Sequence, residues 1–151
     1  MVIGRYSNSS GISLGIGTAK TVVQLTAPAN QRVAFLELKL GFAGTFAAGD
    51  DFKIRLLRQT TAGTMTAATE VKADSGRDLT LQTAVTHTAT AEPTAGEELD
   101  VTYGSLYQQS NVRLTFDLRD IDITENTRLG VEVTTDVAST CYPTIVWAEG
   151  P

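Results

Sequence analysis

The 151-residue sequence contains few of the residue types that most often carry out chemistry. It has one histidine, His87, and one cysteine, Cys141, and aromatic residues make up only 7% of the chain. A lone cysteine excludes an internal disulfide and a cysteine-based zinc site. Nucleophilic catalysis needs a base beside an activated serine or cysteine, and no pattern brings His87 and Cys141 together. We therefore expect a protein that is not an enzyme, with no catalytic, cofactor-binding or metal-binding residues.

Positive charge and long apolar runs are also scarce. The formal net charge is −5, which argues against sequence-independent binding to nucleic acid, because that binding depends on a basic surface. No stretch is apolar for long enough to be a signal peptide or to span a bilayer. Hydrophobic residues make up 42% of the chain, a globular composition. We expect a soluble, reduced protein made in the cytoplasm, with neither nucleic acid nor a membrane as partner.

The charges are spread unevenly along the chain. Residues 1–58 hold seven basic and three acidic residues, whereas residues 59–151 hold five basic and fourteen acidic residues. Two interpretations stay open. The halves interleave in space and the asymmetry disappears, or the molecule has a basic side that faces an acidic partner.

Two motifs resemble ligand sites only in part. In "LGIGTAKT", residues 14–21, a Lys-Thr pair follows glycines, but Ala19 precedes Lys20 and a strand pattern follows, so a phosphate loop is not indicated. "DLRDIDIT" offers Asp117, Asp120 and Asp122 as oxygen ligands for a cation. It lacks the glycine turn and distal glutamate of a calcium loop, and its alternation with isoleucine is typical of a solvated strand face. The solvated face is favoured and cation binding stays open.

Alternation of apolar and polar residues dominates the sequence and predicts strands. In "RVAFLELKLGF" the residues Ala34, Leu36, Leu38, Leu40 and Phe42 fall on one face. Three more runs, "FKIRLL", "VRLTFDL" and "RLGVEVTT", repeat the pattern. From the inward faces of these four runs, nine residues are predicted to lie in the core: Leu36, Leu38, Leu40, Ile54, Leu56, Leu114, Phe116, Val131 and Val133.

Weaker strand patterns complete an all-β fold. They cover Ala19–Ala27, Thr66–Lys72, Ala84–Ala91, Leu99–Tyr103 and Tyr142–Glu149, and short helical turns over residues 74–82 or 105–109 stay open. Eight or nine short strands with Gly, Pro and Asp between them predict a single antiparallel β-sandwich, jelly-roll-like, over residues 19–151. The immunoglobulin fold is disfavoured because its cysteine–tryptophan–cysteine core is missing.

Residues 1–18 differ in composition from the rest. They are rich in glycine and serine, which predicts a flexible N-terminal arm that orders only against a neighbouring protein. Arginine and tyrosine dominate interface energies, so Arg5 and Tyr6 are candidate partner contacts.

Two tracts poor in charge stand out: "LLRQTTAGTMTAATEVK", residues 56–72, and "THTATAEPTAG", residues 86–96. Together they resemble a group of small virion proteins of tailed bacteriophages, the capsid decoration or cement proteins. The resemblance covers roughly residues 19–149 and is most specific over 56–96. In that group a strand ending in an Arg-Gln-Thr-like sequence leads into a Thr/Gly/Ala loop, and a Thr-Ala-rich strand and turn follow.

The resemblance implies a β-sandwich, usually trimeric, on the outer surface of the virion capsid, where it bridges neighbouring subunits of the major capsid protein. Threonine suits a pleated surface and hydrogen-bonds without charge, so the tract fits a contact role. We therefore expect partner contacts at Thr60, Thr61, Thr64 and Met65. A carbohydrate- or receptor-binding jelly-roll module of a phage fibre or surface protein is the alternative, and an enzyme built on a sandwich is a third.

Overall fold

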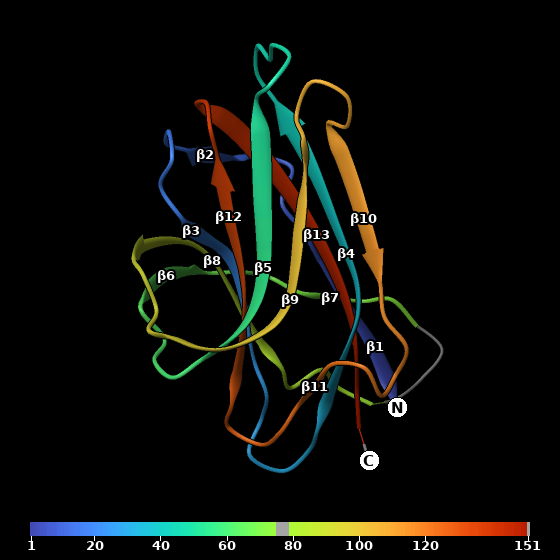
Figure 1. Cartoon of the computed structure of the whole chain (residues 1–151). Helices are drawn as coiled ribbons and strands as arrows, with labels where there is room; N and C mark the ends of the chain where they lie inside the picture. Colours follow the sequence, from blue (N-terminus) through green and yellow to red (C-terminus); the bar gives the residue numbers. More distant parts are fainter. Residues whose placement is uncertain (75–78, 151) are drawn as a thin grey trace.

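The structure, a computed structural model, describes residues 1–74 and 79–150. This part of the chain is all-β and contains thirteen strands but no helix. The strands form two antiparallel sheets, so the predicted β-sandwich is confirmed (Figure 1).

Sheet A has seven strands, and β13 lies at its centre between β4 and β1. Its main path runs β10-β4-β13-β1-β7, with β11 paired to β4 and β2 paired to β13. The bounds are β1 Val2–Ser7, β2 Ile12–Leu14, β4 Val33–Ala43, β7 Val71–Lys72, β10 Asn111–Thr115, β11 Asp122–Ile123 and β13 Ser139–Glu149.

Sheet B has six strands in the order β6-β8-β3-β12-β5-β9. Their bounds are β3 Lys20–Thr26, β5 Asp51–Gln59, β6 Thr64–Ala67, β8 Ala84–Ala91, β9 Ala95–Ser105 and β12 Arg128–Thr135. The strand count exceeds the predicted eight or nine because residues 1–18 contribute β1 and β2, residues 122–123 form β11, and the predicted strand Thr66–Lys72 is divided between β6 and β7. The turn left open over residues 74–82 includes residues 75–78, which lie outside the described part. At the other open position the N–H of Gln109 donates to the carbonyl of Ser105, which closes a single turn.

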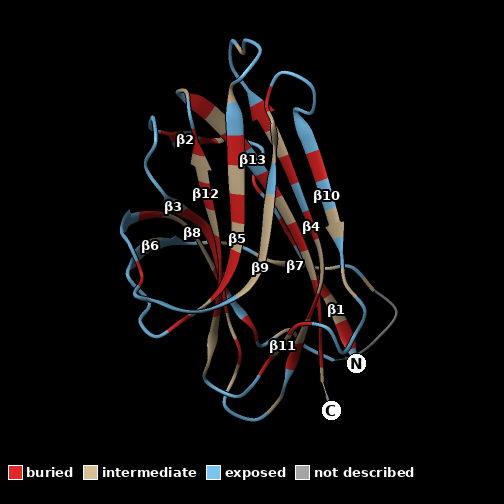
Figure 2. Cartoon of the chain, in the orientation of Figure 1, coloured by how far each residue is buried: buried red, intermediate tan, exposed pale blue. Residues whose placement is uncertain are grey.

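The core lies between the two sheets, where buried residues alternate with exposed ones along the strands (Figure 2). Trp147, Phe35 and Phe52 are its largest fully buried side chains. The rings of Phe42 on β4 and Phe52 on β5 stack with centroids 5.3 Å apart and join the sheets directly. Leu38, Leu40, Ile54, Leu56, Val131 and Val133 are buried as predicted, while Leu114 and Phe116 are half-buried and pack against the core.

A bulge in β4 makes the prediction for Leu36 wrong. Val146 on β13 pairs with Glu37 but the next residue, Trp147, pairs with Phe35, so the ladder skips Leu36. An extra residue in one strand reverses the alternation beyond it. Phe35 is therefore buried, while Leu36 and Ala34 are only half-buried. Farther along the predicted runs, Leu118 lies beyond the end of β10 and is exposed.

The expectation of a flexible arm over residues 1–18 is corrected by the structure, since this segment belongs to sheet A. β1 pairs with β13 over six residues and with β7 on its other side. Val2, Tyr6, Ile12 and Leu14 are buried and alternate with exposed residues. Glycine and serine suggested flexibility, but the alternating apolar residues bury enough surface to order the segment.

Gly4 on β1 provides a test of this correction. A Cβ at residue 4 would lie 2.3 Å from Cε2 of the buried Trp147 ring, whereas a Cβ at residue 15 would make only an ordinary contact, 3.9 Å from Thr18 Oγ1. Gly4→Ala should lower the free energy of unfolding by about 1–3 kcal/mol through overpacking. Gly15→Ala should change it by less than about 0.5 kcal/mol. Equal urea midpoints for the two variants would show that β1 is not packed on Trp147.

Because of the bulge, Leu36 and Leu38 should contribute differently to the stability of the fold. Leu38→Ala should lower the free energy of unfolding by about 2–5 kcal/mol, because Leu38 is fully buried. Leu36→Ala should have a clearly smaller effect, because Leu36 is half-buried. Chemical denaturation of both variants checks this order, and a larger loss at Leu36 would contradict the bulge.

Candidate contact surface

The structure brings the two charge-poor tracts together. β6, from the first tract, pairs with β8, from the second, with Thr66 opposite His87 and Thr64 opposite Ala91. The turn before β6 and the turn after β8 are also joined, because the N–H of Thr60 donates to the carbonyl of Thr94 over 3.0 Å. We call the exposed threonines of these segments the threonine surface: Thr60, Thr61, Thr64, Thr66, Thr90 and Thr94.

Hydrogen bonds between threonines hold this surface in one conformation. Thr61 Oγ1 accepts from the N–H of Thr94 at 2.9 Å and lies 3.2 Å from the Thr94 hydroxyl. The hydroxyl of Thr90 donates to the carbonyl of Thr64. Gly63 permits the tight approach: its φ is +62°, and a Cβ there would lie 2.5 Å from the carbonyl oxygen of Ala91. An ordered surface loses little conformational entropy when it binds a partner.

A buried amide network anchors the turn that carries Thr60 and Thr61. Gln24 Nε2 donates to Gln59 Oε1 at 2.6 Å and to the carbonyl of Thr61 at 3.3 Å. Gln59 Nε2 donates in turn to the hydroxyl of Thr21. Gly130 lies beneath, where a Cβ would come within 2.2 Å of the Gln59 side chain. Sequence reasoning missed this network, and the only signal was a glutamine within each of two apolar strands.

The other predicted contact residues do not belong to the threonine surface. Met65 is half-buried on β6, where its Sδ accepts from the hydroxyl of Thr86. Arg5 is exposed on the outer side of sheet A. Tyr6 is buried and stacks on His87, with ring centroids 5.8 Å apart, so its ring is a core contact between the sheets. Burial raises the pKa of the Tyr6 hydroxyl, with a smaller opposing effect of the Asn8 side chain.

The residues considered for chemistry are held in separate structural roles. Cys141 is fully buried, and burial raises the pKa of its thiol to about 12, which keeps it protonated and unreactive. His87 Nδ1 lies 2.8 Å from the Thr88 hydroxyl. Across residues 1–74 and 79–150, no group of three or more His, Cys, Asp or Glu residues is arranged to hold a metal ion.

The three aspartates of the predicted solvated face are spread over one loop and a short strand. Asp120 Oδ2 accepts from the N–H of Asp117 at 2.9 Å, which closes a turn. Asp122 on β11 forms an ion pair with Arg32 at 3.4 Å. These contacts give the carboxylates of Asp120 and Asp122 local structural roles.

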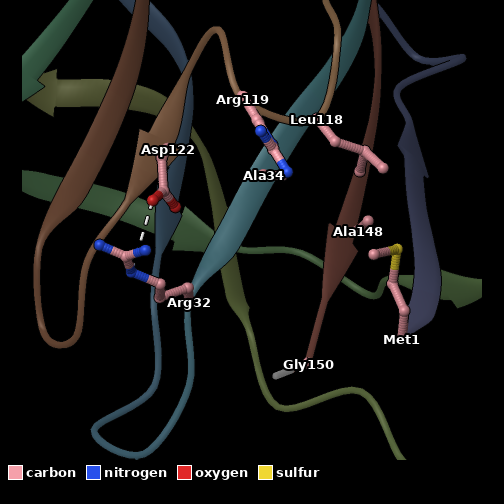
Figure 3. A pocket seen from close by; sticks show the side chains of 8 residues that line it. All are labelled: Met1, Arg32, Ala34, Leu118, Arg119, Asp122, Ala148 and Gly150. Carbon is pink, nitrogen blue, oxygen red and sulfur yellow. Dashed lines mark ion pairs between the residues drawn. The ribbon is translucent and has the colours of Figure 1, made fainter.

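The Arg32–Asp122 pair borders a pocket of about 420 Å³ at one end of the sandwich (Figure 3). Its lining combines apolar side chains, including Leu118, with the guanidinium groups of Arg32 and Arg119. Such a lining can hydrogen-bond an anion, and its carboxylate, Asp122, is paired with Arg32. Among the described residues, no helix has the length and apolar character needed to cross a bilayer.

Comparison with family models, curated proteins and solved structures found no match for this chain.

Gln59 tests the anchoring of the threonine surface. Gln59→Leu should lower the free energy of unfolding by about 1–3 kcal/mol, because it removes one of the two acceptors of the buried Gln24 amide. Gln108 is exposed, so Gln108→Leu is the matched control and should have an effect below about 0.5 kcal/mol. Urea unfolding followed by tryptophan fluorescence measures both, and indistinguishable midpoints would exclude a stabilising network.

Proposed function

We propose that this chain is a structural virion protein that decorates the outer capsid of a tailed bacteriophage. It bridges neighbouring subunits of the major capsid protein and so stabilises the shell. It is made in the host cytoplasm and acts as a homotrimer. The proposal builds on the resemblance of residues 56–96 to capsid decoration proteins.

The observation that carries the proposal is the threonine surface. Two tracts separated in sequence pair through β6 and β8 and through the Thr61–Thr94 hydrogen bonds, and their exposed threonines form one ordered surface of uncharged hydroxyls. Binding a flat protein surface with uncharged hydroxyls avoids the desolvation of buried charge. β6 is also an edge strand with exposed residues, so its outer side is open to a partner.

We also propose that the sandwich is a variant of the jelly roll. Four antiparallel pairings are nested along the chain: β6 with β8, β5 with β9, β4 with β10, and β3 with β12. A long hairpin rolled up on itself produces this nesting, which supports a jelly-roll-like origin. β1, β2 and β13 lie outside the nested pairs and extend sheet A.

Exposed tyrosines favour a second candidate function, a carbohydrate- or receptor-binding module. Tyr103 on β9 and Tyr107 in the following turn are 71% and 62% exposed, and Lys53 lies 5.6 Å from the Tyr103 ring centroid. Exposed rings can stack on sugars. Tyr142, the third exposed tyrosine, lies on sheet A, so the three rings do not form one platform. This separation ranks the binding module second.

Particles of the phage that encodes the chain, prepared without it, test the decoration role. Purified protein added to these particles should co-sediment with them and raise the temperature at which they release DNA, because bridged subunits resist separation. Thr64→Lys should weaken binding at least tenfold by placing a charge on the threonine surface. Thr45→Lys, in the β4–β5 loop at the opposite end of the sandwich, is the matched control (Figure 1). Absence of wild-type binding would contradict the proposal.

A further inference from the structure

The outer face of sheet A has a regular pattern of side chains that the threonine surface does not include. Cross-strand register sets them in rows, and the central row runs from Arg113 on β10 through Lys39 on β4 to Thr144 on β13. The next row places Glu37 beside Val146, which is in turn beside Arg5 on β1. Figure 1 shows β10, β4, β13 and β1 side by side along this face.

This face is basic in an acidic protein. Among the described residues that project outward from β10, β4, β13 and β1, three are basic, namely Arg5, Lys39 and Arg113, and Glu37 is the acidic one. The whole chain has a net charge of −5, so the remainder is more acidic still. In the described part of the chain Arg5 has no acidic side chain within ion-pair distance.

Glu37 organises the two cations next to it. Its Oε2 accepts from Arg113 Nη2 at 2.6 Å and from Nε at 3.0 Å, and its Oε1 lies 3.1 Å from Lys39 Nζ. Burial acts to raise the pKa of Glu37, but the hydrogen bonds from Arg113 and Lys39 outweigh it and hold that pKa below its ordinary value. The cluster keeps one positive charge in excess, and Arg113 remains 63% exposed.

A hollow of about 340 Å³ opens beside this cluster. It is lined by Lys39, Arg113, Asn111, Thr144 and Tyr142, together with Gly41 and the strand residues Leu40 and Val112. Gly41 leaves the space open, because a Cβ there would lie 3.3 Å from Asn111 Oδ1 and 3.9 Å from Cβ of Tyr142. The hollow therefore presents two cations, an amide and a hydroxyl beside an aromatic ring.

We propose that this hollow binds a carboxylate side chain, aspartate or glutamate, from an acidic surface of the protein partner. The inference rests on the proposed function and adds a second contact, on a different sheet from the threonine surface. Charge complementarity selects the occupant, because the hollow holds an excess cation and donors that suit a carboxylate. The Tyr142 ring covers the aliphatic part of the incoming side chain. Two contacts on different sheets allow one copy to bridge two capsid subunits.

Two variants test the hollow, and the measurement is their binding to particles that lack the chain. One variant changes the shape of the hollow and the other changes its charge. Gly41→Thr fills the hollow and leaves every charge in place, and it should weaken binding at least tenfold. Lys39→Gln combined with Arg113→Gln should weaken it at least tenfold and reduce its salt dependence. The matched control, Lys53→Gln with Arg58→Gln, removes two positive charges from sheet B and should change affinity less than threefold.

The outcomes separate this inference from the proposed function. If wild-type protein binds and both hollow variants bind as tightly, the carboxylate site is wrong and the decoration role stands. If the sheet B control weakens binding as much as the hollow variant, net charge is responsible and the site is again wrong. If the wild type does not bind, the decoration role is wrong. Whether the hollow binds a carboxylate is then tested by a measurement without particles.

That measurement is an NMR titration of the wild-type chain with a capped octapeptide of alternating alanine and glutamate. The amide signals of Gly41, Asn111 and Thr144 should shift, and they should not shift with the alanine–lysine peptide. Signals that move mainly in sheet B, or none at all, would overturn the inference. Tighter binding of a DNA duplex than of the glutamate peptide at this face would do the same, since it would make nucleic acid the preferred occupant.

Discussion

The packing of Trp147 on β13 against Gly4 on β1 is the contact on which the rest of the sandwich depends. β13 is the centre of sheet A and pairs with β4, β1 and β2. It therefore connects the N-terminal strands β1 and β2 to β4. The indole ring is fully buried, and a side chain larger than hydrogen at residue 4 would displace it. The C-terminal end of β13 also contacts sheet B. The buried carboxylate of Glu149 accepts hydrogen bonds from the N–H groups of Gln82 and Thr83, just before β8. β8 is the strand that carries one side of the threonine surface.

The sequence predicted the strands whose alternation is uninterrupted. β8 begins and ends where its pattern does, and β5 and β12 bury the expected faces. The pairing of the two charge-poor tracts through β6 and β8 was not predicted. Leu36 was misplaced because a bulge is set by pairing with a partner strand, which local alternation does not show. Residues 1–18 were misjudged because Val2, Tyr6, Ile12 and Leu14 bury their side chains against strands far away in sequence. The Gln24–Gln59 network was invisible for the same reason, since each amide is satisfied only by tertiary contacts.

The uneven charge along the sequence is distributed differently in the two sheets. In sheet B the basic residues of β5 meet acidic residues from later in the chain, as Arg55 pairs with Glu132 and Glu98 and Arg58 pairs with Glu97. Interleaving therefore removes most of the asymmetry there. On the outer face of sheet A, Arg5 and Lys39 are joined by Arg113, and Glu37 balances only part of their charge. The molecule thus offers an uncharged threonine surface on one sheet and a basic face on the other. A protein that joins two neighbouring subunits needs two such separate surfaces.

A cryo-electron microscopy map of the intact particles would test the bridging role most directly. The account predicts density for the sandwich on the outside of the shell, with each copy in contact with at least two capsid subunits. The threonine surface should lie against one subunit, and the Gly41 hollow should lie against an acidic side chain of another. Particles without this density, or a sandwich that contacts a single subunit and leaves both surfaces in solvent, would contradict it.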